Sequence, residues 1–307
     1  MTTANPVYRG RFAPSPTGPL HFGSLVAATG SYLEARTRSG EWRLRMEDVD
    51  APRCSTAAAG KILRVLEACG LEWDGEVVWQ SQRTQAYAVA LERLKAAGRV
   101  FPCACTRKEL ADSGIAPDGA TIYPGTCRQG LPAGRPARAW RVAVGNTRVS
   151  FDDAVQGRII SDLASEAGDF IVLRADGLFA YQLAVVVDDA ETGITHVVRG
   201  ADLLASTPRQ IFLQQCLGVP TPVYAHLPVA VNAAGEKLSK QTRAPPVECS
   251  RPGPELFAAL EFLGQQPPLE LSGVGVAELW TWAKANWQLA RVPRGPALPG
   301  GGRNPSG

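Results

Sequence analysis

The sequence predicts an α/β protein with a parallel sheet, and three features indicate this fold class. Strand-like and helix-like segments alternate over residues 1–100 and again over residues 141–243. A segment rich in Gly, Pro and Cys, residues 101–140, separates these halves and is expected to be an insertion. Alternating strands and helices connect through right-handed crossovers, which bring parallel strands together in one sheet. Residues 244–291 are expected to form a short helical part, and residues 292–307, poor in apolar side chains, a disordered tail.

The first half reads as strand, helix, strand and helix. Residues 7–14, VYRGRFAP, predict a short strand that ends in a Pro-rich turn, and residues 23–40 predict a helix that ends at a glycine. Apolar residues alternate with charged ones in EWRLRMEDVD, residues 41–50, which is typical of a strand. Residues 57–70 predict a second helix, again closed by a glycine.

The second half repeats the alternation. Residues 170–174, FIVLR, and residues 195–200, THVVRG, predict strands, and residues 184–189, AVVVDD, predict a buried segment. The helix predicted over residues 206–218 has clear end signals, which are Thr207 at the cap, Pro208 in the first turn and Gly218 beyond the end.

The composition is that of an ordinary globular protein. Hydrophobic residues make up 45% and charged residues 20%, and no apolar run approaches the roughly 18 residues that span a bilayer. The first residues, MTTANPVYRGRF, lack the apolar core of a signal peptide, so a cytoplasmic protein with no membrane partner is expected. The net charge is +3, and 26 of the 32 basic residues are Arg. This permits a phosphate-bearing partner, but it also fits the codon usage of a GC-rich genome.

The stretch RFAPSPTGPLHFGS, residues 11–24, is the first candidate binding loop. In open α/β sheets ligands bind beyond the carboxyl ends of the strands, and the first strand is expected to end near Arg11 and Phe12. The next helix starts after His21, so its unpaired N–H groups face the same place and favour a phosphate. Gly23 allows close approach. The alternative is a tight turn whose histidine only caps the helix. The chain has neither GxxxxGK[ST] nor a GxGxxG after the first strand.

A second stretch, GEKLSKQ at residues 235–241, places Lys237 and Lys240 three residues apart beside a glycine. Two lysines on a loop suit a triphosphate whose charge rises as pyrophosphate leaves, although KLSK alone is commonly a solvated turn. An HxGx loop after the first strand, together with KxSK near the end of the α/β region, resembles the two ATP-binding signatures of class I aminoacyl-tRNA synthetases. The chain departs from that pattern at Ser24, where many members have a second His, and at Gln241, where Ser or Arg is common.

Four longer stretches narrow the resemblance. RFAPSPTGPLHFGS, RMEDVD, DGLFAYQLAVVVDD and GITHVVRGADLLASTPRQ are together similar to the catalytic domain of glutamyl-tRNA synthetases, over about residues 8–243. KLSKQ and the overall length are most similar to their truncated paralogue family, the glutamyl-Q tRNA(Asp) synthetases. The resemblance implies a Rossmann-like catalytic domain that binds ATP, with Mg²⁺, through His21, Gly23, Lys237 and Lys240.

Glutamate requires a cation for its side-chain carboxylate and an anion for its ammonium group. Two arginines offer bidentate guanidinium groups, Glu47 follows the second strand, and Tyr181 offers a hydroxyl beside an apolar wall. Taken singly, Glu47 could instead pair with Arg45 or Arg53, and Tyr181 could belong to the core. The resemblance implies that the matching positions form the glutamate site, which are Arg11, Phe12, Ala13, Pro14, Ser15, Glu47, Tyr181 and Arg199.

Seven cysteines are an odd number and argue against a disulfide framework. Four are scattered singly, but Cys103, Cys105 and Cys127 lie together in the insertion. Structural zinc takes four ligands in a tetrahedron, and with no histidine nearby the fourth ligand is open between Tyr123, Asp118 and water. The resemblance points to Tyr123, because members of the paralogue family pair three Cys with a Tyr, and it implies one structural Zn²⁺ per chain. The alternative is a set of reduced thiols without metal.

The resemblance implies that a monomer activates L-glutamate with ATP and transfers it to queuosine at the wobble position of tRNA(Asp). The alternatives are a glutamyl-tRNA synthetase that charges the 3′ end and a catalytically dead paralogue that only binds tRNA. A nucleotidyltransferase of the pantothenate-synthetase type has a similar loop, but RGRFAPSPTG and the cysteine-rich insertion argue against it. The 66 residues after Gln241 contain two apolar patterns, ELFAALEFLG and VAELWTWAKANW. They are expected to form a few helices on the catalytic domain, and no second domain that reaches the far end of a tRNA.

Overall fold

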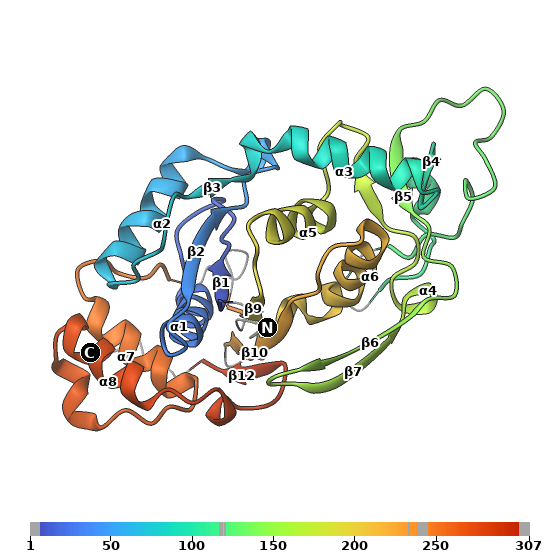
Figure 1. The fold of residues 1–307 in the computed structure, drawn as a ribbon. Coiled ribbons are helices and arrows are strands. Elements are labelled where there is room, and N and C mark those ends of the chain that lie inside the picture. Colours follow the sequence, from blue (N-terminus) through green and yellow to red (C-terminus); the bar gives the residue numbers. More distant parts are fainter. Residues whose placement is uncertain (1–6, 117–118, 120, 233, 239–244, 301–307) are drawn as a thin grey trace, which may run out of the picture.

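The computed structural model describes residues 7–116, 119, 121–232, 234–238 and 245–300 (Figure 1). The centre of the fold consists of parallel strands, in the groups β1-β2-β3 and β9-β10. The N–H of Thr195, just before β9, donates to the carbonyl oxygen of Arg9 in β1 at 2.9 Å, so the two groups lie side by side. The strands follow the order β3-β2-β1-β9-β10, with the bounds β1 (Arg9–Phe12), β2 (Glu41–Met46), β3 (Val78–Trp79), β9 (His196–Gly200) and β10 (Val223–Leu227). This confirms the predicted α/β fold with a parallel sheet.

Helices α1 (Phe22–Arg36) and α2 (Thr56–Ala68) follow β1 and β2. A Cβ atom at Gly30 would lie 2.6 Å from Cδ1 of Leu227, so this glycine is what lets α1 lie close against β10. Helix α1 ends before the predicted glycine, because Gly40 belongs to the turn into β2, where a Cβ atom would lie 2.5 Å from the carbonyl oxygen of Tyr8. In the described part of the chain, no helix has the length and apolar character needed to cross a membrane.

Helix α3 (Thr84–Ala96) ends the first half, and the second half contains α5 (Tyr181–Glu191) and α6 (Thr207–Leu217). The segment AVVVDD lies within α5, and all of its residues are at most 5% exposed, which confirms the predicted buried segment. Helix α6 begins at Thr207, so the cap is Ser206, one residue earlier than predicted, and Gly218 closes the helix in the left-handed conformation with φ of 63°.

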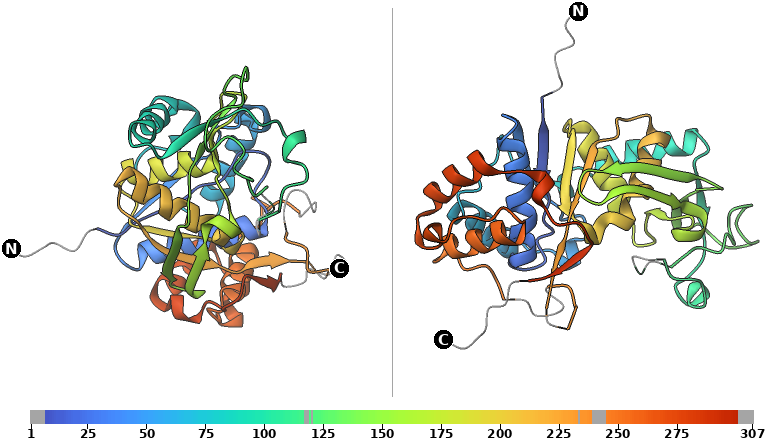
Figure 2. Two further views of the ribbon diagram at one scale, coloured as in Figure 1. Left: turned by 90° about the vertical axis from the view of Figure 1, so that its right-hand side faces the viewer. Right: turned by 90° about the horizontal axis from the view of Figure 1, so that it is seen from below.

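The Cys-rich insertion is part of an antiparallel unit (Figures 1 and 2). Strand β5 pairs antiparallel with both β4 and β8, so the FIVLR segment joins this unit and not the parallel sheet. The hairpin β6–β7 and the short helix α4 lie beside it. The bounds are β4 (Val100–Cys103), β5 (Ala139–Val142), β6 (Arg148–Asp153), β7 (Gly157–Asp162), α4 (Leu163–Glu166) and β8 (Ile171–Leu173).

Two C-terminal helices, α7 (Pro252–Phe262) and α8 (Val276–Asn286), correspond to the two apolar patterns (Figure 1). Their buried side chains join the hydrophobic core beneath α1 and α2. The indole N–H of Trp280 donates to the carbonyl oxygen of Cys69 at 2.7 Å, and that of Trp287 donates to Oε1 of Glu34 at 2.7 Å. The helices are therefore packed directly against the α/β part.

The prediction of a disordered tail is wrong for part of residues 292–307. Residues 297–299 form β12 (Ala297–Pro299), which pairs in parallel with β11 (Val229–Val231). The N–H of Gly300 donates to the carbonyl oxygen of Val231 at 2.8 Å. Pairing of this kind uses backbone groups, so a segment poor in apolar side chains can still be held in place. Residues 301–307 lie outside the described residues.

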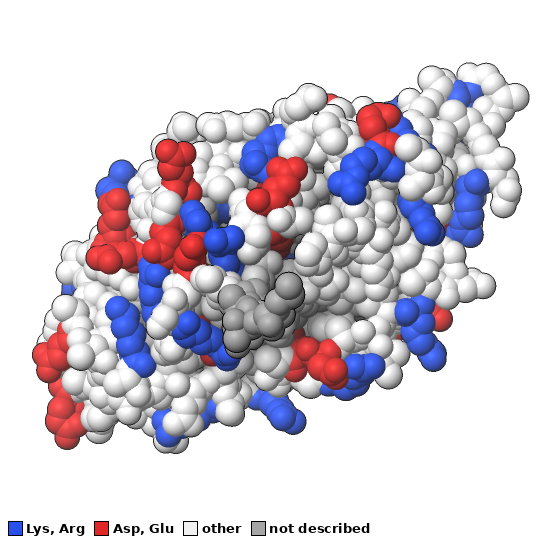
Figure 3. Space-filling model, in the orientation of Figure 1, with Lys and Arg blue, Asp and Glu red and all other residues white. Residues whose placement is uncertain are grey.

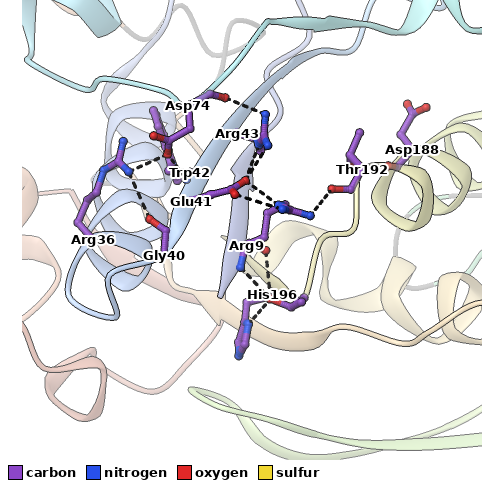
Figure 4. A network of polar contacts seen from close by, with 11 residues as sticks. Arg9, Arg36, Gly40, Glu41, Trp42, Arg43, Asp74, Asp188, Thr192 and His196 are labelled. Carbon is purple, nitrogen blue, oxygen red and sulfur yellow. Dashed lines mark hydrogen bonds and ion pairs between the residues drawn. The ribbon is translucent and has the colours of Figure 1, made fainter. Parts of the chain in front are cut away.

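Ion pairs join the amino-terminal ends of β1 and β2 (Figure 4). Nε of Arg9 donates to Oε2 of Glu41 at 2.7 Å, and Arg43 contacts the same oxygen at 2.7 Å. Arg9 also donates to the carbonyl oxygen of Thr192 at 3.2 Å, which fixes the turn before β9. This network occupies the end of the sheet opposite to the carboxyl ends of its strands.

Candidate active site

A cavity of about 640 Å³ lies at the carboxyl ends of the parallel strands. This is where ligands bind in open α/β sheets, because the loops that follow the strands diverge there. The cavity is lined by every residue predicted for glutamate and ATP that the structure describes, namely Arg11, Phe12, Ala13, Pro14, Ser15, His21, Gly23, Glu47, Tyr181, Arg199 and Lys237. The remaining predicted residue, Lys240, lies outside the described residues.

His21 occupies the start of α1 at one wall of the cavity. Its Nδ1 atom accepts from the N–H of Ser24 at 3.3 Å, and its Nε2 atom lies 3.2 Å from Oγ of the same serine. A Cβ atom at Gly23 would lie 3.3 Å from the imidazole ring, so the glycine lets the ring pack flat against the first turn. The histidine therefore both caps the helix and faces the cavity, beside N–H groups that favour an anion.

Lys237 contributes a cation near the same helix start, because a Cβ atom at Gly23 would lie 3.7 Å from the carbonyl oxygen of Leu238. Its Nζ atom lies 2.5 Å from Oδ2 of Asp202, in the 3₁₀ turn after β9. The backbone next to it is fixed, because the N–H of Leu238 donates to the carbonyl oxygen of Ala230 at 2.8 Å. The ammonium group is half exposed, and a strongly anionic ligand in the cavity can compete with the carboxylate for it.

Glu47 lies directly after β2 within a buried chain of charges. Its Oε1 atom contacts Arg45 at 3.3 Å, as one structural alternative predicted, whereas Arg53 pairs with Asp50. Only 11% of the Glu47 side chain is exposed. Burial raises the pKa of Glu47 above its ordinary value, and nearby guanidinium groups oppose that shift only in part. The carboxylate is therefore poorly solvated and suited to a second cation supplied by a ligand.

Arg11 and Arg45 share one buried carboxylate. Nε of Arg11 lies 3.2 Å from Oδ1 of Asp189, and Arg45 contacts the same oxygen at 2.6 Å. Burial alone would raise the pKa of Asp189, but the two guanidinium groups together hold it below its ordinary value. Asp189, the last acid of AVVVDD, thereby orients Arg11 from 178 residues away. Two successive acids at the end of a buried segment were the sequence signal that could have identified it.

Arg199, in β9, faces the cavity beside Tyr181, the first residue of α5. One terminal nitrogen of Arg199 donates to the Tyr181 hydroxyl at 3.3 Å, and the other contacts Oγ1 of Thr207 at 2.8 Å. The phenol is half-buried and lines the cavity, so it does not belong to the core alone. Burial raises the pKa of Tyr181, so its hydroxyl stays protonated.

The cavity therefore combines complementary groups at fixed positions. Two guanidinium groups favour an anionic side chain, and a poorly solvated carboxylate favours an ammonium group. The start of α1 and Lys237 favour phosphates. The sequence analysis missed several groups of the wall, among them Asp202 and the segment 227–230, where β10 ends and β11 begins. The short apolar run 227–230 has no residue type that marks a binding site.

A second cluster lies in the insertion, where the three Sγ atoms of Cys103, Cys105 and Cys127 all lie within 4.8 Å of one another. The hydroxyl of Tyr123 lies 3.5 Å from Sγ of Cys103 and 3.4 Å from Sγ of Cys105, and the Cys105 and Cys127 sulfurs are 3.7 Å apart. A tetrahedron with zinc–sulfur bonds of about 2.3 Å has edges of about 3.8 Å. Three thiols and one phenol therefore fit zinc, and Asp118 lies outside the described residues.

Comparison with known proteins gives a consistent result. Residues 8–250 match the family described as tRNA synthetases class I (E and Q), catalytic domain. The chain is 63% identical, over 95% of its length and 92% of the relative's, to a protein of Aromatoleum aromaticum named glutamyl-Q tRNA(Asp) synthetase. It is 62% identical to a protein of the same name from Dechloromonas aromatica, over 94% of this chain and 97% of the relative.

Among solved structures, the chain is similar in fold to a glutamate-tRNA synthetase from Elizabethkingia anophelis. The TM-score is 0.77 at 24% sequence identity, and the match covers 95% of this chain and 68% of that one. At this identity the likeness concerns the fold alone.

Proposed function

Because the chain belongs to the class I tRNA synthetases of the E and Q type, and within them to the glutamyl-Q tRNA(Asp) synthetases, we propose that it activates L-glutamate with ATP and transfers it to the queuosine base of tRNA(Asp). The observation that carries this proposal is one cavity that combines Arg11, Arg199 and Glu47 with the start of α1. Such a cavity matches a dicarboxylic amino acid placed next to a nucleoside triphosphate.

In the first step, an α-carboxylate oxygen of glutamate attacks the α-phosphorus of ATP. A new oxygen–phosphorus bond forms, the bond to the β-phosphate oxygen breaks, and pyrophosphate leaves with Mg²⁺. The product is glutamyl-adenylate. In the second step, a hydroxyl of the queuosine cyclopentenediol attacks the activated carbonyl carbon, loses its proton and displaces AMP. No covalent enzyme intermediate is required, so positioning and charge stabilisation account for the catalysis.

The glutamate subsite follows from the charges of the cavity. Arg11 and Arg199 hold the side-chain carboxylate, and the Tyr181 hydroxyl next to Arg199 adds a donor. Glu47 holds the ammonium group. The loop Arg11–Ser15 closes over the substrate, and the N–H of Glu47 donates to the carbonyl oxygen of Pro14 at 3.0 Å, which ties this loop to β2. Glutamine lacks the second negative charge and leaves the two guanidinium groups poorly compensated.

The ATP subsite lies at the start of α1. His21 and the adjacent backbone bind the phosphates, and Gly23 provides room for close approach. Lys237 moves from Asp202 to the triphosphate, and Lys240 in the same loop stabilises the charge that develops on the departing pyrophosphate. Zinc, when bound by Cys103, Cys105, Tyr123 and Cys127, is structural and orders the insertion.

The identity of the RNA that accepts glutamate is proposed from the name that the relatives carry. Arg side chains around the cleft contact the phosphates of the anticodon stem-loop. In Figure 3, basic side chains outnumber acidic ones over the part of this face that carries β4 and β5, which provides a surface for an RNA backbone. We also propose that the protein acts as a monomer in the cytoplasm, which gel filtration and cell fractionation can test.

The test is a pair of assays with the purified protein. Glutamate-dependent ATP–pyrophosphate exchange should occur, and exchange with aspartate or glutamine alone would contradict the substrate. Labelled glutamate should then be transferred to queuosine-containing tRNA(Asp), including tRNA(Asp) that lacks its 3′ CCA. Label on the 3′ end of tRNA(Glu) would instead identify a glutamyl-tRNA synthetase. Binding of tRNA without either reaction would identify a catalytically dead paralogue.

A further inference from the structure

Arg199 is held by a buried set of acceptors on the side away from the cavity. Its Nε atom donates to Nε2 of His226 at 3.1 Å. One terminal nitrogen donates to Oγ1 of Thr207 at 2.8 Å and to Oε1 of Gln210 at 2.9 Å. The other terminal nitrogen contacts the Tyr181 hydroxyl, which lines the cavity. Three of these four partners, His226, Thr207 and Gln210, are not among the residues that line the cavity, so the guanidinium plane is set mainly by groups that the substrate does not touch.

His226, in β10, is fully buried and is itself oriented by Asp153 at the end of β6. Nδ1 of His226 lies 2.6 Å from Oδ2 of Asp153, and neither side chain is exposed to solvent. Oδ1 of Asp153 accepts the backbone N–H groups of Val155 at 3.0 Å, Gln156 at 2.8 Å and His226 at 3.1 Å. The carboxylate is thus fixed by the turn of the β6–β7 hairpin and by β10.

This arrangement selects one tautomer of the histidine. Nδ1 carries the proton that is donated to Asp153, so Nε2 presents a lone pair to the Nε–H of Arg199. The Thr207 hydroxyl also lies 3.0 Å from Nε2, and a proton on Nε2 would face the Nε–H of Arg199. Burial is the main cause that lowers the pKa of His226 to about 4, and the neighbouring Arg199 adds to the shift although Asp153 opposes it. The ring is therefore neutral at physiological pH, as the geometry requires.

We propose that Asp153 and His226 are positioning residues for glutamate recognition. Asp153 fixes the tautomer of His226, His226 fixes the plane of Arg199, and Arg199 thereby meets the substrate's side-chain carboxylate in one orientation. The inference rests on the proposed function, because it takes that carboxylate to be the ligand of Arg199. It assigns the β6–β7 hairpin, which lies outside the cavity, a role in amino-acid specificity.

The physical reason is preorganisation. A free guanidinium group rotates about several bonds, whereas these contacts hold Arg199 in one plane and leave the terminal nitrogen beside Tyr181 to meet the substrate's carboxylate. Tyr224 adds to the restraint, because its ring stacks on His226 with centroids 6.0 Å apart, and the guanidinium carbon of Arg199 lies 5.5 Å from its centroid. Fixing these groups before the substrate arrives removes an entropic cost from binding.

The test is the substitution Asp153→Asn, which preserves the shape of the side chain. Its amide oxygen can still accept the hydrogen bonds from the backbone N–H groups. Its NH₂ group then faces Nδ1 and forces the proton of His226 onto Nε2. We expect KM for glutamate in ATP–pyrophosphate exchange to rise by at least about tenfold, while KM for ATP changes less than about twofold. Nitrogen-15 NMR of the histidine rings should show the change of tautomer directly.

Matched variants separate positioning from stability. Asp152→Asn alters the exposed neighbour on the same strand, whose side chain is 77% exposed, and should leave both KM values unchanged. At His226, Gln can keep an acceptor near the position of Nε2, whereas Leu cannot. His226→Gln should therefore retain a lower KM for glutamate than His226→Leu, whichever of them melts at the higher temperature.

Three results would count against the inference, and they are distinguishable. If the wild-type protein shows glutamate-dependent exchange and folded Asp153→Asn keeps its KM for glutamate, the positioning role is wrong and the proposed function stands. If the wild-type protein shows no glutamate-dependent exchange, the proposed function fails and the inference fails with it. Equal values of KM for glutamate in the two His226 variants would also overturn the positioning role.

Discussion

At the scale of single residues, burial sets the chemistry of the carboxylate that faces the ligand. Glu41 begins β2 and Glu47 directly follows it, yet their environments differ. Burial raises the pKa of Glu47, whereas hydrogen bonds from Arg9 are the largest cause that lowers the pKa of Glu41 to about 2. A neutral carboxylic acid cannot pair with an ammonium group. Of these two residues, only Glu47 should therefore make binding of the amino acid depend on pH.

We predict that KM for glutamate rises as the pH falls from 8 to 5, at pH values where an ordinary glutamate is still ionised. Glu47→Gln should raise KM for glutamate by at least about tenfold at pH 7.5 and should remove most of this pH dependence. Glu41→Gln is the matched control and should keep the wild-type profile. A wild-type KM that stays flat over this range would contradict the role of Glu47.

His226 predicts a pH dependence of stability. Its pKa in the folded protein, about 4, is below the ordinary value of 6.5, so only the unfolded chain takes up a proton between these values. The stabilisation is complete above pH 6.5 and is lost as the pH falls through this window. Between pH 7 and 5 the free energy of unfolding should decrease by about 2 kcal/mol from this residue. Urea unfolding of the wild type and His226→Gln can measure it, and an equal decrease in both would contradict the prediction.

At the scale of elements, two segments that form no regular helix support the two candidate sites, one in the insertion and one beside the cavity. One is the Cys-rich loop between β4 and β5. Cys103 ends β4 and Cys105 follows it, whereas Tyr123 and Cys127 come from further along the loop. Nε of Arg141 in β5 donates to Sγ of Cys103 at 3.4 Å. The other segment is β12, which covers the outer edge of β11.

Zinc in the first segment should be essential for its stability. Metal analysis of protein purified without chelator should find about one zinc per chain. Cys105→Ser should lose the metal and lower the melting temperature by about 5 °C or more, because a structural site contributes folding energy directly. Cys249→Ser changes an exposed cysteine elsewhere and serves as the control. Absence of metal, or an unchanged melting temperature in Cys105→Ser, would contradict the prediction.

The second segment should support ATP binding. Strand β11 leads into the turn that carries Lys237, and the Val231 backbone bridges to Lys237 on one side and to the β12 segment on the other. Deleting residues 294–307 should raise KM for ATP by about threefold or more, because β11 loses its outer partner. Deleting only residues 301–307 should leave KM for ATP at its wild-type value. Equal KM values in the two truncated proteins would show that β12 does not support this turn.

At the scale of the whole molecule, charge and the placement of the cavity govern the encounter with RNA. The net charge is only +3, so attraction must come from the local distribution of Arg and not from the total. Affinity for tRNA(Asp) should fall by at least about tenfold between 50 and 200 mM salt, as counterions are released from the phosphates. Fluorescence anisotropy can measure this. An affinity independent of salt would rule out a phosphate-dominated interface.

The fold class could be predicted from the order of strand-like and helix-like segments, and most of the candidate site from short motifs and the family that they resemble. The loop of residues 11–24, the segment around Glu47 and the KLSK turn are contiguous motifs, and the first two follow strands that the sequence predicts. Since the carboxyl ends of parallel strands meet at one edge of the sheet, such motifs converge there whatever the details of packing. The three cysteines were visible from residue type and short spacing, whereas the choice of Tyr123 as the fourth ligand came from the family resemblance.

The groups that orient the site residues from outside the cavity could be identified only in the folded structure. Asp189 orients Arg11 across 178 residues, and Asp153 orients His226 across 73. No local pattern encodes such pairs, because they depend on which segments the fold packs together. The same holds for β8, which pairs with β5 and not with the parallel sheet, and for β12, which backbone pairing holds although its composition suggested disorder. Long-range hydrogen bonding selects these partners after the sheet has assembled.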